Sequence, residues 1–443
     1  MSTYRRTSCT RRQMLRNTGL AGVGLWLAGG SRQLAAGSAN EKLNIACVGL
    51  GNQGNANVGL VAGENIVALC DVDASRVAMF ANRFPSAKCF ADFRVMLDKM
   101  ERHIDAVVVT TPNHSHAVIS IPAMKMGKHV YCEKPLAHTI HEIRAMQQAA
   151  AESKVVTQLG TQIHAGSNYR RTVELIRAGA IGAVRKVHVW FGKPGGFKRY
   201  EPLTERPTEK PPVPEGLDWD LWTGPAPMRP YHPCYHPHDW HYWWHFGNGE
   251  MGNMAPHFFD LAFWALDLGA PESVEATGPP VHPDSTPFWL DCAWRFPARA
   301  ELPPVEVTWH DGRGCPAAVR ELLGFESGAG VLFVGDKGML LANYTERKLL
   351  PEEDFAGYQP PEPTIPDSVG CQRKEWIEAC KGNGEALCSF DYGGPLTEVI
   401  LLGNIAYRTG KTLRWDAAKM TFPNHPEADQ YLRQEHRSGW HLS

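Results

Sequence analysis

A glycine-rich turn forms the clearest chemical pattern in the sequence. The turn, Gly49-Leu50-Gly51-Asn52-Gln53-Gly54, directly follows the apolar run Leu43–Val48. Glycines at a strand end let the backbone approach a pyrophosphate, and the following helix offers free N–H groups and its positive dipole end to the phosphates. A turn that only connects a strand to a helix is the alternative. The pattern predicts a dinucleotide site that includes Gly49, Gly51, Asn52, Gln53 and Gly54.

Asp71 supplies the second half of this pattern. It directly follows the apolar run Ile66–Cys70 and lies 22 residues after Gly49. A carboxylate at this distance accepts hydrogen bonds from the adenosine ribose and repels a 2′-phosphate. We therefore expect the cofactor to be NAD rather than NADP.

Both features require a parallel sheet to hold them. Up to about residue 160, apolar β-branched runs alternate with helical patterns, which is typical of a doubly wound parallel sheet. The predicted helices lie near 53–63, 74–84, 114–126 and 139–153. The predicted strands are Leu43–Val48, Ile66–Cys70, Asp105–Thr110, His129–Cys132 and Val155–Leu159.

The pattern changes from Val184 onward. Proline-rich stretches at 202–237 and 351–366 are expected to be long surface loops, and a helix near 393–409 should pack back on the core. Five strand-like runs without crossover helices favour a mainly antiparallel sheet in a second domain. The fold class is therefore α/β, a Rossmann domain followed by an α+β domain. The five runs are Val184–Phe191, Ser273–Thr277, Phe288–Phe296, Val305–Trp309 and Val331–Phe333.

The first 39 residues have the features of an export signal. Thr10-Arg11-Arg12-Gln13-Met14-Leu15-Arg16 precedes an apolar, glycine-rich stretch at 19–30, and small residues allow cleavage after Ala36 or Ala39. Paired arginines before such a stretch are typical of the twin-arginine route, and the stretch is too short and glycine-rich for a membrane span. A disordered basic tail is the alternative. We expect a periplasmic or otherwise exported protein that uses the twin-arginine machinery.

The net charge narrows the classes of partner that the protein can bind. Residues 1–39 hold six arginines and no acid, so their removal shifts the net charge from −2 to about −8. An acidic mature protein is a poor candidate for binding nucleic acid or anionic membrane surfaces.

The eleven cysteines include no CxxC pair. Because folding in the cytoplasm disfavours disulfides, we expect free thiols.

Export and a nicotinamide cofactor constrain each other. The twin-arginine route carries folded proteins, and free NAD should be scarce outside the inner membrane. We hypothesise that NAD binds tightly in the cytoplasm and travels with the protein. Each turnover must then return the cofactor to its starting state or pass electrons to a second substrate.

Three motifs resemble those of the Gfo/Idh/MocA oxidoreductase family. They are Glu133-Lys134-Pro135 and Thr110–His116 (TTPNHSH), each after a predicted strand, and Gly335-Asp336-Lys337-Gly338 in the second domain. The similarity extends over nearly all of residues 43–415 and implies a Rossmann domain, an open C-terminal sheet and a substrate between them. Most members oxidise or reduce sugars, polyols or related carbohydrates. The exported glucose–fructose oxidoreductases hold their cofactor tightly, and other members are NAD-dependent glycosidases.

These observations divide the chain into four segments. We expect a twin-arginine signal peptide at 1–39, an NAD-binding Rossmann domain at 40–165, a substrate and oligomerisation domain at 166–420, and a C-terminal tail at 421–443. The resemblance implies a homo-oligomer built through the exposed face of the second sheet.

Lys134 is the first catalytic candidate that the resemblance implies. Oxidation of a secondary alcohol requires a base for the hydroxyl proton, and reduction requires the same group as an acid. A lysine can serve when its pocket and a neighbouring cation lower its pKa. In the resembling family this lysine points at substrate and nicotinamide, whereas Glu133 and Pro135 shape the turn. An exposed lysine at a strand end is the alternative.

His257 and Asn253 match a family pattern of Asp-x-x-x-His at a helix start. Their spacing of four places both side chains on one helix face, which the resemblance turns toward the cleft. His257 matches the substrate-side histidine, with a packed core histidine as the alternative. Asn253 replaces the aspartate, and an amide holds a hydroxyl but takes no proton at neutral pH. Proton transfer then falls to Lys134 or His257, or the chemistry differs from that of a plain dehydrogenase.

Further ligand contacts are expected where the strands end, because doubly wound folds bind ligands at the carboxyl edge of the sheet. By resemblance Asn113 and His116 line the nicotinamide side, with a helix-capping role for Asn113 as the alternative. Lys193, at the end of the first strand of the second domain, could reach substrate hydroxyls. The full set of additional cofactor candidates is Thr111, Pro112, Asn113, His116, Glu133, Lys134 and Gln162.

The segment His232–His245 is rich in histidine and aromatic residues. Its ligand types would suit zinc, but their spacings fit no familiar closed site, so we expect no metal. Aromatic faces stack on the C–H faces of sugars, and imidazoles supply hydrogen bonds. Trp240 and His241 are therefore candidate substrate contacts, with a purely structural aromatic cluster as the alternative.

The sequence thus favours an exported oxidoreductase that holds NAD tightly and transfers a hydride to or from a carbohydrate CH–OH group. An NAD-dependent glycoside hydrolase, which would use transient oxidation and elimination, is the first alternative. A non-catalytic sugar-binding protein that retains NAD is the second. Asn253 is compatible with the second alternative, whereas Lys134 and His257 argue against it.

Overall fold

The computed structural model describes residues 42–194, 206–325 and 327–442. The predicted signal peptide at 1–39 lies outside these residues. Glu41–Ser443 form one compact unit, in which a parallel sheet is followed along the chain by a larger mixed sheet.

Six parallel strands form the first sheet in the order β3-β2-β1-β4-β5-β6. Alternate side chains of β1 enter two different apolar clusters, so both faces of the sheet are buried. The strands are β1 (Asn44–Val48), β2 (Asn65–Cys70), β3 (Lys88–Phe90), β4 (Ala106–Val109), β5 (His129–Glu133) and β6 (Thr157–Gly160). The α-helices are α2 (Gln53–Val61), α3 (Ala74–Ala81), α4 (Phe93–Met100), α5 (His116–Lys125) and α6 (Ile140–Ser153), and the 3-10 helices are η1 (Glu101–His103), η2 (Asn113–Ser115) and η3 (Gln162–Ala165).

The predicted doubly wound sheet is confirmed, and the five expected strands lie within one or two residues of their predicted ends. The sequence missed β3 and α4. β3 has only three residues and lies at the edge of the sheet with two of them exposed. Such a short, half-exposed strand has too few apolar positions to show a period.

The second sheet has eight strands in the order β13-β12-β11-β7-β10-β9-β8-β14. Only β7 and β10 pair in parallel, and the other pairs are antiparallel, so the predicted mainly antiparallel sheet is confirmed. The short strands β12, β13 and β14 were not predicted. The strands are β7 (Val184–Pro194), β8 (Ser273–Thr277), β9 (Leu290–Phe296), β10 (Val305–Gly312), β11 (Ala329–Gly335), β12 (Met339–Ala342), β13 (Arg347–Leu350) and β14 (Leu413–Arg414).

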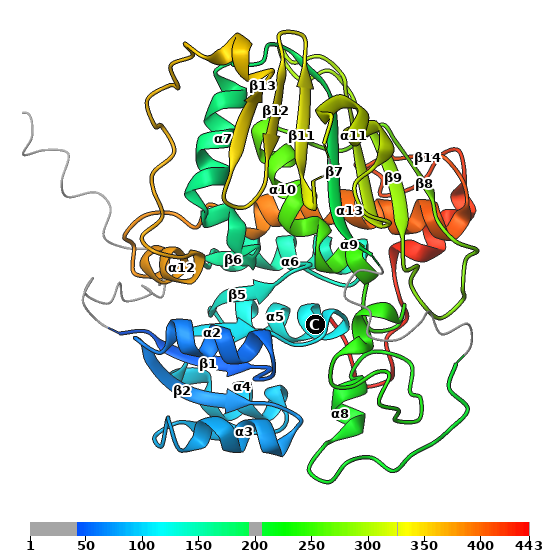
Figure 1. Cartoon of the computed structure of the whole chain (residues 1–443). Helices are drawn as coiled ribbons and strands as arrows, with labels where there is room; N and C mark the ends of the chain where they lie inside the picture. Colours follow the sequence, from blue (N-terminus) through cyan, green and yellow to red (C-terminus); the bar gives the residue numbers. More distant parts are fainter. Residues whose placement is uncertain (1–41, 195–205, 326, 443) are drawn as a thin grey trace, which may run out of the picture. The chain divides into compact units, whose positions relative to one another are not determined.

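Helices join this sheet to the first one (Figure 1). The predicted closing helix is confirmed as α13, which packs on α6, α10 and β8. α12 was not predicted and returns to the first domain, where it contacts α2, β5 and β6. The helices of this region are α7 (Ser167–Arg177), α8 (Trp219–Thr223), α9 (Gly249–Asn253), α10 (Ala255–Ala265), α11 (Ala317–Leu323), α12 (Gln372–Cys380) and α13 (Phe390–Thr409), with 3-10 helices η4 (Asp239–Tyr242), η5 (Glu352–Phe355) and η6 (Pro426–Leu432).

The expectation of a surface loop at 202–237 is confirmed for residues 206–216, which form no helix or strand and are mostly exposed, and is wrong from Leu217 onward. This stretch contains α8 and forms an apolar cluster of its own, in which Trp219, Trp222 and Tyr235 are buried. The Asp218 N–H donates to the Val72 carbonyl (2.9 Å), which attaches the cluster to the end of β2. The prolines suggested a loop, but the aromatic residues between them bury enough apolar area to pack. We call residues 206–247 the covering segment.

Within the described part of the chain, every helix is too short or too polar to span a membrane. The cysteines there are unpaired, as expected. Cys47, Cys70 and Cys132 are buried in strands of the first sheet, where cysteine behaves as a small hydrophobe.

Gly49→Ala should destabilise the protein. Gly49 has a φ of +83°, and a Cβ there would lie 2.5 Å from the Thr110 carbonyl oxygen. We expect the free energy of unfolding, measured with urea, to fall by about 1–3 kcal/mol. Gly59→Ala, in the same turn-and-helix unit, is the matched control, because a Cβ at Gly59 meets nothing within 4 Å. It should raise that free energy by about 0.5–1 kcal/mol. Equal effects of the two substitutions would contradict the assignment of a constrained turn.

Candidate functional site

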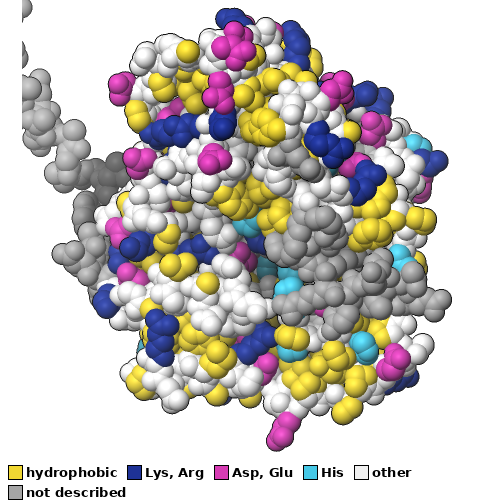
Figure 2. Space-filling model, viewed as in Figure 1, with side chains coloured by type: hydrophobic (Ala, Val, Ile, Leu, Met, Phe, Trp, Pro, Cys, Tyr) yellow, Lys and Arg dark blue, Asp and Glu magenta, His cyan; other side chains and the backbone are white. Residues whose placement is uncertain are grey.

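A cavity of about 350 Å³ lies at the carboxyl ends of the first sheet and is also lined by residues of the second domain. Figure 2 shows histidine side chains in the hollow on this face of the molecule. Gly54 and His116 lie outside the cavity wall, and the side chain of Lys193 lies outside the described residues. The predicted site residues that line the cavity are Gly49, Gly51, Asn52, Gln53, Asp71, Thr111, Pro112, Asn113, Glu133, Lys134, Gln162, Trp240, His241, Asn253 and His257.

The glycine turn is packed too closely for larger residues. The Gly49 N–H donates to the Cys70 carbonyl (2.9 Å), so the turn is attached to the end of β2. Gly54 begins the first turn of α2, where a Cβ would clash with the Gly49 carbonyl oxygen. Gly54 therefore shapes the turn without lining the cavity. A Cβ at Gly51 would clash with the guanidinium of Arg76, which also lines the cavity.

Asp71 is buried beside this turn. Its Oδ2 accepts a hydrogen bond from the Leu50 N–H (2.7 Å), and its Oδ1 accepts one from the Asp73 N–H (3.0 Å). Burial raises the pKa of the Asp71 carboxyl above its usual value, while these two hydrogen bonds and Arg76 act in the opposite direction. Each oxygen keeps a further lone pair for a ligand hydroxyl. Arg76, which the sequence reasoning missed, pairs with Asp73 at 3.3 Å.

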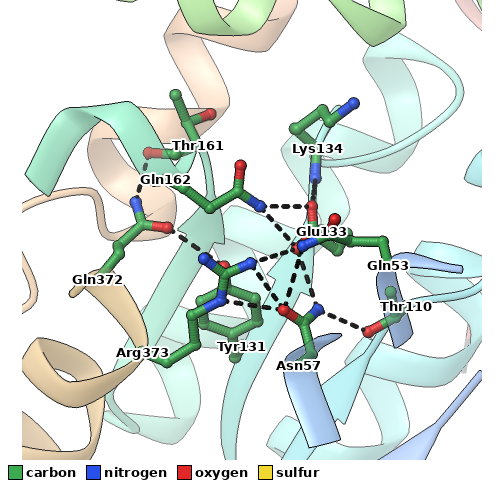
Figure 3. A network of polar contacts seen from close by, with 10 residues as sticks. All are labelled: Gln53, Asn57, Thr110, Tyr131, Glu133, Lys134, Thr161, Gln162, Gln372 and Arg373. Carbon is green, nitrogen blue, oxygen red and sulfur yellow. Dashed lines mark hydrogen bonds and ion pairs between the residues drawn. The ribbon is translucent and has the colours of Figure 1, made fainter. Parts of the chain in front are cut away.

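Glu133 is the centre of a buried polar network (Figure 3). Its Oε1 accepts hydrogen bonds from the side chains of Asn57 (3.0 Å), Gln162 (2.9 Å) and Arg373 (3.2 Å). Arg373 also donates to the Asn57 Oδ1 (2.7 Å), and Asn57 donates to the Thr110 hydroxyl (3.0 Å). The network connects the ends of β4 and β5 with α2, η3 and α12. Glu133 therefore serves as a structural anchor as well as a residue of the cavity wall.

Lys134 follows this anchor and reaches across to α9. Its Nζ donates to the backbone carbonyl (2.9 Å) and the side-chain Oδ1 (2.8 Å) of Asn253. The Asn253 amide in turn donates to the Glu250 Oε2 (3.2 Å), and Glu250 also accepts from the Tyr242 hydroxyl (2.8 Å). Burial lowers the pKa of Lys134, whereas the carboxylates of Glu133 and Glu250 raise it. The carboxylate missing at position 253 is thus supplied one helical turn earlier, by Glu250.

His257 and His241 complete this end of the cavity. Burial and the nearby Lys134 hold the pKa of both imidazoles well below the usual value, so both are neutral at pH 7. His241 stacks on Trp240 with ring centroids 3.6 Å apart. A neutral imidazole has one N–H donor and one acceptor nitrogen, so each histidine can position a hydroxyl.

His116 is buried behind the cavity wall. Its Nδ1 lies 2.8 Å from the Pro135 carbonyl oxygen, and its Nε2 lies 2.9 Å from the Thr111 carbonyl oxygen. Burial lowers the pKa of His116, and a neutral imidazole donates to one of these two carbonyls, so His116 packs between the two loops and the structure does not bring it to the cavity.

The sequence reasoning missed several residues because they come from distant segments. Arg373 and Glu250 enter through α12 and α9, and no local motif marks them. His236 and Trp222 enter through the covering segment, and Trp440 enters through the C-terminal tail. The aromatic residues of the covering segment are the sequence signal that indicates a packed wall there, because tryptophan is highly buried on average.

The residues present fit a nicotinamide dinucleotide. The glycine turn, Asp71 and the strand-end residues line one continuous cavity. Both polar atoms of the Asn113 side chain and the Thr111 hydroxyl are buried without a partner among the described residues. A buried polar group without a partner is costly, and a bound dinucleotide is a group that could supply partners here. In the described ranges, no three His, Cys, Asp or Glu side chains are grouped to hold a metal ion.

Two family models match the chain and together cover more than half of it. One, GFO_IDH_MocA, is described as an oxidoreductase family with an NAD-binding Rossmann fold and matches residues 43–161. The other, GFO_IDH_MocA_C2, is described as the C-terminal alpha/beta domain of the oxidoreductase family and matches residues 166–302.

Relatives with assigned names match part of the chain. A levoglucosan dehydrogenase of Pseudarthrobacter phenanthrenivorans is 31% identical over 261 residues, which are 55% of this chain and 56% of that protein. A glycosyl hydrolase family 109 protein of Solibacter usitatus is 32% identical over 192 residues, 39% of this chain and 43% of that protein. The chain thus spans about half the length of the curated relatives it matches.

Solved structures share the fold. The WlbA dehydrogenase from Bordetella pertussis, in complex with NADH and UDP-GlcNAcA, has a TM-score of 0.60 and 18% identity. The similarity covers 85% of this chain and 99% of that one. At this identity the comparison supports the two-domain architecture.

Arg373→Met should destabilise the protein strongly. It removes the cation that pairs with Glu133, and both side chains are only 5% exposed. Leaving one member of a buried pair uncompensated costs about 3–5 kcal/mol, to be measured as the free energy of unfolding. The control is Lys186→Met, whose pair with Glu306 is 46% and 32% exposed. That substitution should cost about 0–1 kcal/mol.

The double variant Arg373→Met with Glu133→Gln should recover part of the loss, because it removes the unpaired charge. A double variant no more stable than Arg373→Met alone would show that lost packing, rather than the buried charge, causes the effect.

Proposed function

The chain belongs to the Gfo/Idh/MocA oxidoreductase family, and we propose that it is an NAD-dependent oxidoreductase acting on a CH–OH group of a sugar, polyol or related carbohydrate. The observation that carries the proposal is the position of Lys134. Its Nζ lies in the wall of the cavity that contains the glycine turn and Asp71, and it is held by Asn253 opposite His257. The name of the relative levoglucosan dehydrogenase supports a carbohydrate substrate.

NAD, when bound, supplies a hydride acceptor for the carbinol C–H. The residues of the chain must then remove the hydroxyl proton. An ammonium has three N–H donors, and Asn253 accepts two of those of Lys134. The third position on the Lys134 Nζ can contact the substrate oxygen. Because burial lowers the pKa of Lys134, the ammonium loses its proton more readily, and the neutral amine then takes the hydroxyl proton of the substrate. Asn253 holds the amine in place without titrating itself.

The neutral imidazoles fix the orientation of the carbohydrate. His257 lies on α10 and His241 on η4, so the two segments present hydrogen-bonding groups to the same cavity. Trp240 adds an aromatic face, to which the C–H face of a sugar can stack. The covering segment adds Trp222, His236 and Trp240 to the cavity wall, which reduces the contact of the reacting groups with bulk water.

We further propose that NAD is retained during turnover and that the protein is exported. The paired arginines at 11–12 support export, and the cavity walls added by the covering segment and Trp440 support retention. The first test is to purify the mature protein from the periplasm without added cofactor and release nucleotide by acid and alkali. Near-stoichiometric NAD or NADH is expected. An empty protein would contradict retention and leave an exchangeable cofactor.

A glycoside hydrolase is the second candidate, favoured by Asn253 and by the similarity to a family 109 glycosyl hydrolase. Transient oxidation acidifies the adjacent C–H, the glycosidic substituent leaves, and water addition and re-reduction restore the sugar without net redox change. Product analysis distinguishes the two. Free sugar without a keto product would favour the hydrolase, whereas a keto product with NADH would favour the dehydrogenase.

Lys134→Met should abolish turnover while NAD binding persists. The substitution keeps an unbranched chain one atom shorter and removes the amine. With levoglucosan, myo-inositol and glucose as first substrates, we expect kcat to fall at least about 100-fold, because proton transfer contributes roughly 10²–10⁴-fold. Bound nucleotide should stay within twofold of the wild-type content. Full activity of the variant would overturn the role of Lys134.

Substitutions beside Lys134 should shift the pH profile of kcat/KM for oxidation in opposite directions. Activity rises with pH as Lys134 loses its proton. Glu250→Gln removes a carboxylate that stabilises the ammonium, so the pKa falls and the rising limb moves to lower pH. Asn253→Asp places a carboxylate against Nζ and should move the limb to higher pH by about one unit. Shifts in the same direction would contradict this electrostatic account.

A further inference from the structure

The cavity has an apolar part that neither the glycine turn nor Lys134 explains. It is lined by residues of four segments that are far apart in the chain: Ala91 and Phe93, Ile119, Leu221 and Trp222, and Trp440. Such a set of aromatic and aliphatic side chains is suited to a flat aromatic ring.

This apolar part lies next to Asp71. The Asp71 N–H donates to the Phe90 carbonyl (3.1 Å), so Ala91 follows directly after the strand end that flanks Asp71. On the other side, the Val72 carbonyl accepts the N–H of Asp218 in the covering segment. If Asp71 holds the adenosine ribose, the base attached to that ribose must lie among these neighbours.

Trp440 is held in place as a fixed wall. It is 6% exposed although only three residues follow it. The Arg94 guanidinium lies 4.4 Å from its ring centroid, and the Phe93 ring lies 6.1 Å away at a tilt. The backbone N–H of Trp440 donates to the Arg437 carbonyl (3.0 Å). These contacts hold the Trp440 ring against α4 and fix its position.

The residues before Trp440 attach the tail to the covering segment and to α6. Arg437 donates to the carbonyls of Gly224 (3.0 Å) and Asp220 (2.9 Å) and pairs with the Asp220 carboxylate (2.6 Å). His436 bonds through Nε2 to Glu142 on α6 (3.0 Å). The tail, red in Figure 1, therefore runs from the second domain down to α8 and α5.

We propose that the C-terminal segment 436–440 completes the cofactor site, with Trp440 forming one wall of the adenine pocket and retaining the dinucleotide. The inference rests on the proposed use of NAD and assigns a binding role to residues that the domain division left as a tail. It also gives a structural cause for retention, since the adenine leaves only when Trp440 moves or the covering segment opens.

A purely structural anchor is the competing explanation for Trp440. A tryptophan that only fastened the tail would be expected to point into a closed core, as Trp415 does against Phe422 and Glu398. Trp440 instead lines the cavity together with Asp71 and the glycine turn. The two explanations predict different ligand dependence, because only a pocket wall discriminates between ligands with and without adenine.

The test measures binding of NAD, ADP-ribose and nicotinamide mononucleotide to apoprotein by calorimetry, in the full mature chain. For Trp440→Ala we expect the Kd for NAD and ADP-ribose to rise about ten- to 100-fold, as for other losses of base stacking on an aromatic side chain. The Kd for the mononucleotide, which lacks adenine, should change less than twofold. NAD should also dissociate faster from the variant.

Trp415→Ala is the matched control, because it removes a buried tryptophan of the same region that does not line the cavity. It should leave the ratio of the NAD and mononucleotide Kd values unchanged. Trp440→Phe and Trp440→Leu guard against a folding defect, since both keep an apolar side chain and only Phe keeps a ring. The Phe variant should bind NAD more tightly than the Leu variant.

Three results would overturn the inference. Wild-type affinity of Trp440→Ala for NAD would show that the ring is not part of the pocket. Equal weakening of all three ligands would show that the tail acts by general stabilisation. A wild-type protein that binds no NAD would overturn the proposed function together with this inference, whereas NAD binding without carbohydrate turnover would leave the role of Trp440 intact.

Discussion

The buried carboxylate of Glu133 is the constraint on which the site depends. A buried carboxylate requires compensation of its charge, and Arg373, Asn57 and Gln162 provide it from three different elements. Because these partners are also fixed by packing, the strand end that carries Lys134 has one position relative to the glycine turn. The polar network therefore connects cofactor site and candidate base in a single rigid arrangement (Figure 3).

The carboxylate of Glu250, in the second domain, also helps to position Lys134, because it holds the Asn253 side chain. Glu250 holds the Asn253 amide, and Asn253 presents its carbonyl oxygens to Lys134. The family pattern has an aspartate where this chain has Asn253, yet the site keeps a negative charge close to the lysine. The amide between them holds the amine of Lys134 in place without titrating itself. This arrangement holds Lys134 between the two domains.

The covering segment and the C-terminal tail add residues to a cavity that starts from the Rossmann turn and the second domain. The covering segment binds the end of β2 through Asp218, and the tail binds α6 through His436. Both therefore add walls on the side where an open dinucleotide site would face water. Tight retention of a cofactor needs such walls, because the exchange rate depends on how often the covering elements open.

The sequence by itself determined the parallel sheet, the glycine turn with Asp71, the mainly antiparallel second sheet and the helix at α13. These depend on periods and turn residues within short windows, where local sterics and apolar patterning decide the structure. Only the tertiary structure decided that Arg373 pairs with Glu133, 240 residues away, and that Glu250 holds Asn253. It also decided that His116 lies outside the cavity wall and that Trp440 lines the cavity. Such contacts follow from how whole elements pack, and no local pattern encodes which distant side chain fills a given buried space.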